Sequence, residues 1–320
     1  MRSLGLPKIF HPLCLNFKKH NVSLQYYFSL GKLLKKLLFL ILLFLTALSL
    51  SAAPTSCGGI YYGNTAPDII NTKLLPKTTE ICYEQFAIMH SGLTKTPLWS
   101  AEHLTRDMLT KKAKRGDDFH EDAHLRLDER AELTDYAHSG YDRGHMSPSG
   151  DFDERQSNEE CFSLANMVPQ DHDNNSGIWA DIESSTRYLA KKKGEIYVVT
   201  GPLYLGNHPR RIGNRVLVPT NIFKAIYIPS SGEGAAYITE NVPGRDYKVI
   251  SIAELEKISG INIFPQMSQA AKSYATRLPQ PKPSNKGRHS YENRQNTNSS
   301  DDNSFIGKFK RKMNNYYRGY

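Results

Sequence analysis

Residues 139–152 read Ser-Gly-Tyr-Asp-Arg-Gly-His-Met-Ser-Pro-Ser-Gly-Asp-Phe, and this stretch carries the strongest structural signal in the chain. A glycine stands on each side of the Tyr-Asp-Arg triplet, and a proline follows soon after. This pattern indicates a backbone that turns at defined points and presents His145 beside a loop. The imidazole lies two residues from Arg143 and three from Asp142. A surface ion pair beside a structural histidine would explain the same residues.

A second informative stretch runs from residue 162 to residue 187. Asn174, Asn175 or Ser176 can cap a helix there. Within that helix, a ridge of residues recurs every four positions and drifts by only about 40° per step. The ridge carries an amide, an indole, a carboxylate and a guanidinium, from Asn175, Trp179, Glu183 and Arg187. An ordinary cap above a Glu183/Arg187 surface pair is the alternative, and the cap and metal-ligand interpretations compete for the same Asn175 oxygen.

The elements expected around these stretches are mixed. β-Branched or aromatic runs bounded by Gly, Pro or Asn predict strands at 196–200, 215–218, 222–228 and 235–239. Apolar periodicity predicts helices at 100–110, 176–193 and 252–258. Several strands followed by a short helix favour an α+β fold with a central, mostly antiparallel sheet flanked by helices.

Taken together, the two stretches resemble the DNA/RNA non-specific endonucleases, the ββα-metal nucleases that include endonuclease G, and are most similar to its secreted bacterial members. The signature Asp142-Arg143-Gly144-His145 is followed by Asn166-x-x-Pro-Gln and then by Asn175-x-x-x-Trp-x-x-x-Glu183 at matching spacing. The resemblance covers about residues 86–265. It implies a ββα-metal nuclease fold in a single catalytic domain at 56–276.

The resemblance also implies the central roles in the site. His145 would be the general base, and Asn175 would be the direct protein ligand of one Mg²⁺, for which Mn²⁺ is an alternative. Glu183 would hold metal-bound waters. Arg143 and Arg187 would clamp phosphate oxygens.

Three further residues receive supporting roles from the same resemblance. Arg115 matches an upstream family arginine through a variable spacing. Asp142 is expected to orient the local backbone or Arg143. Asn166 is expected to hold the loop that positions Asn175.

The implied activity is hydrolysis of phosphodiester bonds in DNA and RNA without sequence specificity, because phosphate contacts carry no sequence information. No small-molecule cofactor is expected, and the sequence leaves open whether the protein forms a homodimer. Two alternatives remain. One is an exported nucleic-acid-binding or uptake protein that does not cleave, and the other is a metal-dependent phosphodiesterase acting on small substrates.

The net charge of +9 does not by itself indicate a polyanion-binding domain. Residues 1–36 carry seven basic and no acidic side chains, and residues 277–320 carry ten basic and three acidic ones. Of the 41 basic and 32 acidic residues, 24 and 29 therefore remain in 37–276. The body of the chain is acidic, and the basic, Pro-rich and Asn-rich segment 277–320 is expected to be a disordered tail.

The N-terminal region, 1–55, is expected to direct export. Lysines precede an apolar run at 37–50, and small residues follow at 51–53. This arrangement is typical of a secretory signal peptide, with an uncleaved membrane anchor as the alternative. The location expected is periplasmic or extracellular. In an oxidising compartment Cys57 and Cys82 could pair and leave Cys161 buried, although the sequence does not decide the pairing.

Overall fold

The computed structural model describes residues 35–36, 55–111, 113–206, 209–213 and 215–283. The chain divides into two units, Met1–Ser51 and Ala52–Tyr320, and every strand and helix named below belongs to the second. Nearly all of the expected signal segment, and the expected tail from 284 onward, lie outside the described residues. Within the described ranges, no helix combines the length and the apolar character needed to cross a membrane.

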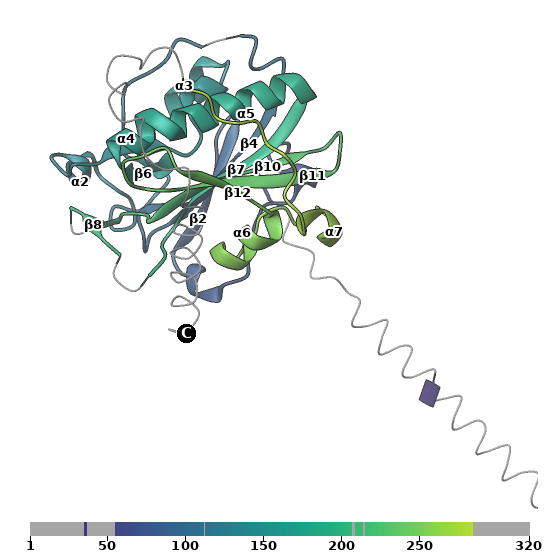
Figure 1. Ribbon diagram of the computed structural model, residues 1–320. Coiled ribbons are helices and arrows are strands. Elements are labelled where there is room, and N and C mark those ends of the chain that lie inside the picture. Colours follow the sequence, from purple (N-terminus) through teal and green to yellow (C-terminus); the bar gives the residue numbers. More distant parts are fainter. Residues whose placement is uncertain (1–34, 37–54, 112, 207–208, 214, 284–320) are drawn as a thin grey trace, which may run out of the picture. The chain divides into compact units, whose positions relative to one another are not determined.

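A seven-stranded antiparallel sheet forms the centre of the domain (Figure 1), and the expected α+β fold is confirmed. Neighbouring strands follow the order β12-β11-β10-β7-β4-β3-β2. The strands are β2 (Thr78–Cys82), β3 (Phe86–Ser91), β4 (Thr96–Thr105), β7 (Glu195–Leu203), β10 (Asn221–Ile228), β11 (Glu233–Glu240) and β12 (Tyr247–Ile250).

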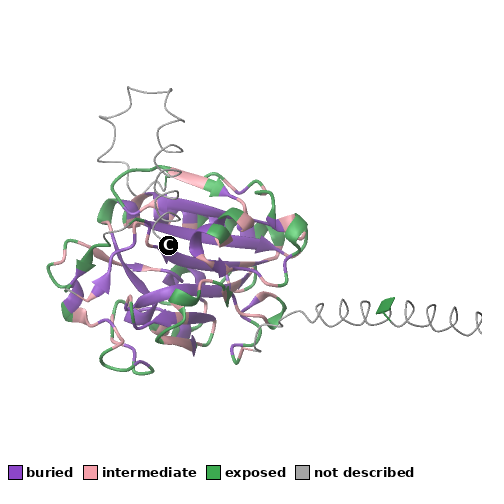
Figure 2. Cartoon of the chain, turned by 90° about the horizontal axis from the view of Figure 1, so that it is seen from below, coloured by how far each residue is buried: buried purple, intermediate pink, exposed green. Residues whose placement is uncertain are grey.

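Helices cover both faces of this sheet, and the side chains of the central strands alternate between two apolar cores. In β10, Ile222 and Ile226 pack in the core beneath α5 (Ala180–Lys193). Phe223 and Ala225 pack in the opposite core, against α6 (Ile252–Ser259). Figure 1 shows α5 on one side of the sheet and α6 with α7 (Gln269–Lys272) on the other, and Figure 2 shows the central strands buried.

Short elements connect the sheet and the helices. Three two-stranded pairs lie outside the main sheet: β1 with β13, β5 with β6, and β8 with β9. These strands are β1 (Asp68–Ile69), β5 (Asp142–His145), β6 (Met167–Gln170), β8 (Arg211–Ile212), β9 (Val216–Leu217) and β13 (Ile261–Asn262). The remaining helical elements are η1 (Tyr62–Asn64), η2 (Thr72–Leu74), α2 (Leu133–Tyr136), η3 (Ser149–Asp151), α3 (Arg155–Glu160), η4 (Leu164–Asn166), α4 (His172–Asn174) and η5 (Asn175–Trp179).

One predicted element is wrong. Residues 100–110, expected to be helical, instead continue strand β4 as far as Thr105 and then turn. Trp99 and Ala101 of this strand join the α6-side core, whereas Leu104 joins the α5-side core. Because both faces of β4 are buried, the strand lacks the alternation of apolar and polar residues that marks a half-exposed strand.

The open question of cysteine pairing is answered by the structure. Cys57 and Cys82 form a disulfide, which ties the segment before η1 to strand β2. Cys161 is free and buried.

The folded part of the domain extends past the expected boundary at residue 276. Leu278 is buried in the α5-side core. The Tyr237 hydroxyl donates to the Pro279 carbonyl, and the Ser185 hydroxyl of α5 donates to the Gln280 carbonyl at 3.5 Å. The expected tail therefore begins with residues that pack on the domain, because an apolar side chain at 278 stands before the proline-rich stretch.

Candidate active site

The signature stretch forms strand β5, which pairs with β6 so that Asp142 lies opposite Gln170 and His145 opposite Met167. Gly144 is needed in this pair. A Cβ atom at position 144 would lie 2.0 Å from Gln170 Oε1 and 2.6 Å from Gln170 Cβ. The Gln170 amide is itself fixed, since its Nε2 donates to Asn174 Oδ1 at 2.8 Å. The turn residue recognised in the sequence therefore allows two strands to approach closely.

His145 ends strand β5 and is flanked by two aromatic rings. The ring centroids of Phe162 and Phe119 lie 4.8 Å and 5.7 Å from that of His145. Nε2 of the imidazole is buried and has no hydrogen-bond partner in the described part of the chain. Burial, assisted by the positive charge of Arg115, lowers the pKa of His145 to about 3. The imidazole is therefore neutral at pH 7, with a nitrogen that can accept a proton.

Two arginines lie on the same aromatic rings. The guanidinium carbon of Arg143 lies 4.5 Å from the centroid of Phe119, and that of Arg115 lies 5.6 Å from the centroid of Phe162. Both distances are within the range of cation–π contacts. The structure thus brings the charge of Arg115, which the sequence matched only loosely, close enough to affect His145. Arg143 lies on a ring that itself contacts the imidazole.

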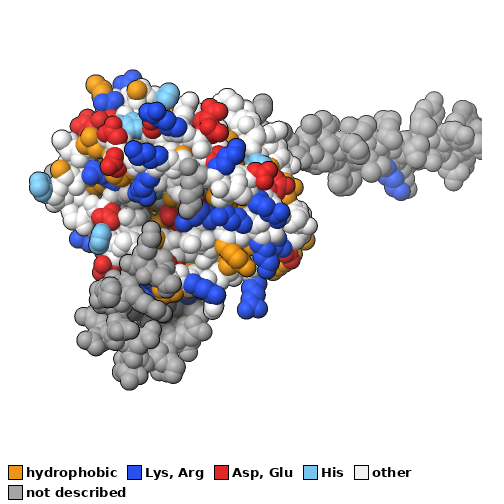
Figure 3. Space-filling model, turned by 90° about the horizontal axis from the view of Figure 1, so that it is seen from above, with side chains coloured by type: hydrophobic (Ala, Val, Ile, Leu, Met, Phe, Trp, Pro, Cys, Tyr) orange, Lys and Arg blue, Asp and Glu red, His pale blue; other side chains and the backbone are white. Residues whose placement is uncertain are grey.

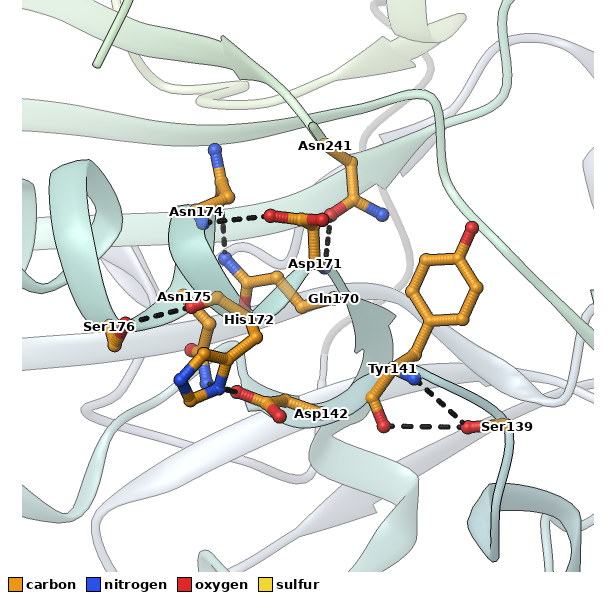
Figure 4. A network of polar contacts seen from close by, with 10 residues as sticks. All are labelled: Ser139, Tyr141, Asp142, Gln170, Asp171, His172, Asn174, Asn175, Ser176 and Asn241. Carbon is orange, nitrogen blue, oxygen red and sulfur yellow. Dashed lines mark hydrogen bonds and ion pairs between the residues drawn. The ribbon is translucent and has the colours of Figure 1, made fainter. Parts of the chain in front are cut away.

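Asn175 lies inside the helical segment and does not cap it. The cap is Asp171, whose side chain accepts from the backbone N–H of Asn174 at 3.0 Å. The amide nitrogen of Asn175 donates to Asp142 Oδ2 at 2.9 Å, as Figure 4 shows. The structure thus excludes the cap interpretation, and the hydrogen bonds of the described residues leave Asn175 Oδ1 unused.

Asp142 differs from its expected role toward Arg143. Its Oδ2 accepts from Asn175, and the same oxygen lies 2.9 Å from Nδ1 of the exposed His172 (Figure 4). Asp142 therefore orients the Asn175 amide directly. Among the described contacts no hydrogen bond joins Asn175 to His145; strand β5 connects them, with about 10 Å between the Cα atoms of residues 142 and 145 at the usual rise of a strand.

The ridge of the second stretch is formed by a π-helical turn followed by an α-helix. Gly177 leaves helical geometry (φ −103°, ψ −107°), so η5 is kinked before α5 begins at Ala180. Such π turns often occur at functional sites. Trp179 is fully buried in the α5-side core. The kink and this anchor determine where Asn175 lies relative to the straight helix that follows.

Glu183 and Arg187 lie one turn apart on α5. Arg187 Nη1 donates to Asp151 Oδ1 at 2.7 Å, and Asp151 is almost completely buried. Burial raises the pKa of Glu183 to about 7, against the opposing charges of Arg187, Lys224 and Arg115. In the part of the chain that the structure describes, no hydrogen bond engages the Glu183 carboxylate. This carboxyl group is therefore available to another ligand.

Asn166 holds a different loop from the one expected. Its side chain pairs with the backbone of Ser147, accepting from that N–H at 3.0 Å and donating to that carbonyl at 2.8 Å. Its backbone carbonyl accepts from Met146 N–H at 3.0 Å. Asn166 thus fixes the two residues after His145, and not the loop that carries Asn175.

Sequence reasoning did not identify several contributors to the site. Phe119 and Phe162 enclose His145, and Asp151 anchors Arg187. No local pattern points to them, because each contact joins segments far apart in the chain. Lys224 is different, since a lysine inside the apolar strand 222–228 is visible in the sequence as an anomaly.

The donor set around Asn175 and Glu183 fits a hard cation. An amide oxygen and a carboxylate are oxygen donors of the kind that Mg²⁺ accepts while keeping several waters. Among the described residues, the group of three His, Cys, Asp or Glu ligand atoms close enough to hold an ion is Cys57, Glu80 and Cys82, and its two sulfur atoms are joined in the disulfide. An ion held by Asn175 and Glu183 would therefore take most of its ligands from water.

Comparisons with known proteins agree with this geometry. The solved structure of the EndoG/EndoGI complex matches with a TM-score of 0.56 and 28% identity, over 60% of this chain and 88% of that one, so the fold is that of a ββα-metal nuclease. A family model described as DNA/RNA non-specific endonuclease matches residues 66–270. The chain belongs to this family.

Several curated relatives are about one-third identical to the chain. The mitochondrial nuclease EXOG of Xenopus laevis is 32% identical over 209 residues, which are 58% of this chain and 58% of the relative. Nuclease C1 of Cunninghamella echinulata var. echinulata is 33% identical, over 58% of this chain and 82% of the relative. A nuclease of Nostoc sp. is 32% identical, over 62% and 77%. The chain spans about three-fifths of the length of the EXOG relatives.

Proposed function

We propose that this protein is a metal-dependent endonuclease that hydrolyses phosphodiester bonds in both DNA and RNA, with Mg²⁺ as its ion. One observation carries the proposal: a neutral imidazole with a free, buried Nε2 lies between two rings that each carry an arginine. A phosphodiester anion resists attack by hydroxide, so a positioned base and positive charge are the two groups that its hydrolysis needs.

The proton transfer belongs to His145. Neutral imidazole accepts a proton from the attacking water, and the Phe119 and Phe162 rings hold it in place and exclude bulk water. In the free protein, the charge of Arg115 contributes to the lowered pKa of His145. A substrate phosphate bound beside His145 would offset that charge, raise the pKa of His145 and so make the imidazole a stronger base in the complex.

Positive side chains bind the phosphate. Arg143 and Arg115 lie on the two rings that contact His145, and Arg187, one turn beyond Glu183, is held by Asp151. Asn175 Oδ1 would hold the Mg²⁺, with Glu183 binding the waters around the ion. When bound, Mg²⁺ supplies charge that stabilises the negative oxygens of the transition state and the leaving oxygen.

Lack of sequence preference follows from the kind of contacts offered. Arginine, water and metal reach phosphate and sugar groups, which are common to all sequences. Figure 3 views the α5 side of the domain, where Lys and Arg side chains gather across the middle of the face. Affinity for nucleic acid should therefore fall steeply as salt rises.

Export is the second part of the proposal. The apolar run at 37–50 follows a basic flank and precedes small residues, as in a signal peptide. The Cys57–Cys82 disulfide supports an oxidising compartment such as the periplasm or the extracellular space. Detection of the mature chain outside the cytoplasm, and an N-terminal sequence beginning near residue 54, would test this assignment.

The central test of the proposed activity uses supercoiled plasmid and a single-stranded RNA with Mg²⁺, with and without EDTA. Both substrates should be cut internally, and EDTA should stop the cutting. Binding without cutting would favour the nucleic-acid-binding alternative. Turnover of small phosphodiesters while plasmid and RNA stay intact would favour the phosphodiesterase alternative. Mn²⁺ added after EDTA tests whether a second ion can serve.

A further inference from the structure

A row of buried polar side chains crosses the α5-facing side of the central sheet. Ser100 of β4 lies opposite Thr200 of β7, and Thr200 lies opposite Lys224 of β10. All three are completely buried. Val198 and Ile222 on the same face are apolar, whereas Glu102, opposite Val198, is a buried carboxylate. Polar groups in one row of an apolar face need partners above the sheet.

The partner above this row is the segment just after His145, through the Ser147 side chain and the Met146 backbone. The Ser100 hydroxyl lies 2.6 Å from the Ser147 hydroxyl. Lys224 Nζ donates to Thr200 Oγ1 at 2.8 Å and to the Met146 carbonyl at 3.4 Å. The row therefore connects the sheet to the two residues that follow the proposed base.

Lys224 makes directional contacts that a simple buried ion pair would not need. Its nearest carboxylate is Glu102, with Nζ 3.9 Å from Oε1, which is longer than a hydrogen bond. Burial, with the neighbouring Asp151 carboxyl adding to it, raises the pKa of Glu102 well above its usual range, although Lys224 opposes this. The hydrogen bonds of the ammonium instead go to a hydroxyl and a backbone carbonyl.

The same ammonium also contacts the helix that carries the rest of the site. Lys224 Nζ lies 5.6 Å from the ring centroid of Trp179, within the range of a cation–π contact. Trp179 follows Asn175 by four residues and precedes Glu183 by four. Lys224 therefore contacts both the segment after His145 and the kinked helix. The Arg187–Asp151 ion pair also joins these two elements, and the Asn175–Asp142 bond joins the helix to strand β5.

We infer that Lys224 is a positioning residue of the active site, which holds the Met146 carbonyl and Trp179 against the sheet and so determines how His145 faces the Asn175–Glu183 helix. The inference rests on the proposed nuclease function. Asn166 fixes the N–H groups of residues 146 and 147 from one side. Lys224 holds the Met146 carbonyl from the sheet below, so the peptide after His145 is fixed on two sides.

The test compares three variants with wild type by thermal melting and by kcat and KM for plasmid cleavage in Mg²⁺. Lys224→Met keeps the length of the side chain but removes the ammonium. Glu102→Gln/Lys224→Met removes the buried carboxylate as well, so that no uncompensated charge remains. Lys272→Met is the matched control, because Lys272 is equally buried and pairs with Glu256 at 2.8 Å beneath α6 and α7, on the other side of the sheet.

Lys224→Met should lower both Tm and kcat, with kcat falling at least about tenfold and KM changing less than about twofold. The double variant should recover most of the Tm but not the kcat. Lys272→Met should lower Tm and leave kcat within about twofold of wild type. If kcat instead recovers together with Tm in the double variant, Lys224 is only part of a structural ion pair, and the inference is wrong.

A readout independent of turnover separates this inference from the proposed function. If wild type cuts neither DNA nor RNA, the nuclease proposal fails. The imidazole NMR signals of His145 then still report on Lys224. They should shift in Lys224→Met and in the double variant and stay in place in Lys272→Met, whereas unchanged His145 signals in all variants would overturn the positioning role.

Discussion

Glu183 shows at the scale of one residue how the candidate site lowers the stability of the fold. Its pKa is raised by burial to about 7 from an ordinary value of 4.5. The neutral carboxyl therefore favours the folded state below pH 4.5, and this contribution is lost as the pH rises through about 7. At alkaline pH the buried Glu183 carboxylate is charged in the folded protein, and a bound cation beside it would stabilise that charged form.

Replacing Glu183 by Gln should stabilise the protein at alkaline pH. A pKa raised from 4.5 to about 7 corresponds to a stability difference of about 3 kcal/mol, with less expected because the side chain is partly exposed. The gain in Tm over wild type should be larger at pH 8.5 than at pH 5, while cleavage falls sharply. Thermal melts at the two pH values measure this. Glu159→Gln, on an exposed Arg155 pair, is the control and should change neither. An equal effect of Glu183→Gln at both pH values would contradict the assignment.

His145→Ala should remove the base without removing the binding surface. We expect kcat to fall by at least about 10², the usual scale for a lost general base. Affinity for DNA, measured by fluorescence anisotropy in EDTA, should change little because the arginines on Phe119 and Phe162 remain. Cleavage near the wild-type rate would exclude His145 as the base.

The sequence identified polar residues of the site but not their setting. His145, Asn175, Glu183 and Arg187 stand at spacings that a linear pattern can show. Phe119 and Phe162 remained invisible as site residues, since aromatic rings are common in any core and their contact with His145 depends on tertiary structure. The partner of Asp142 was also missed, because a strand pattern does not show which helix packs beside it.

At the scale of elements, the misassigned strand β4 and the kinked helix have a common cause. Local propensity describes one segment at a time, whereas β4 owes its conformation to neighbours on both edges and both faces. The sequence predicts a helix over 176–193, and α5 confirms most of it. Its first turn is π-helical around Gly177, because packing of Trp179 and the Asn175–Asp142 bond hold it there.

The β5–β6 pair gives a prediction about close approach. Gly144→Ala places a methyl group 2.0 Å from Gln170 Oε1, so the strands must separate. Such overpacking costs about 1–3 kcal/mol, and displacement of His145 should lower kcat at least tenfold. Gly58→Ala is the control, because its Cβ would meet nothing within 4 Å. Unchanged kcat and Tm for Gly144→Ala would show that the pair can yield freely.

The disulfide gives a second prediction at the element scale. Cys57 and Cys82 are 25 residues apart, and closing such a loop stabilises the fold by about 3.5 kcal/mol. Cys57→Ser/Cys82→Ser should lower Tm by roughly 7–14 °C. Below its Tm the variant should retain wild-type kcat, because Cys57 belongs to the α6-side core. Dithiothreitol should lower the Tm of wild type and leave that of the variant unchanged. A variant that is inactive although folded would show that this edge of the sheet supports the site.

For the whole molecule, the end of the folded domain can be located by truncation. A chain ending at Pro283 keeps the buried Leu278 and the bonds to the Pro279 and Gln280 carbonyls, whereas one ending at Thr276 loses them. The shorter chain should be less stable by about 2–3 kcal/mol, or roughly 5–10 °C in Tm. Both lack residues 284–320, so equal loss of low-salt DNA binding would assign that effect to the tail. Equal Tm values for the two truncated chains would show that the folded domain ends at residue 276.

The placement of helices on both sides of one sheet also has a practical consequence. The candidate catalytic groups lie with α5, while α6 and α7 cover the opposite side (Figure 1). Ser273, just after α7, is exposed. A tether attached at Ser273 would fix the protein to a bead through the α6–α7 side and leave the α5 side, with the candidate site, open to long nucleic acids in solution.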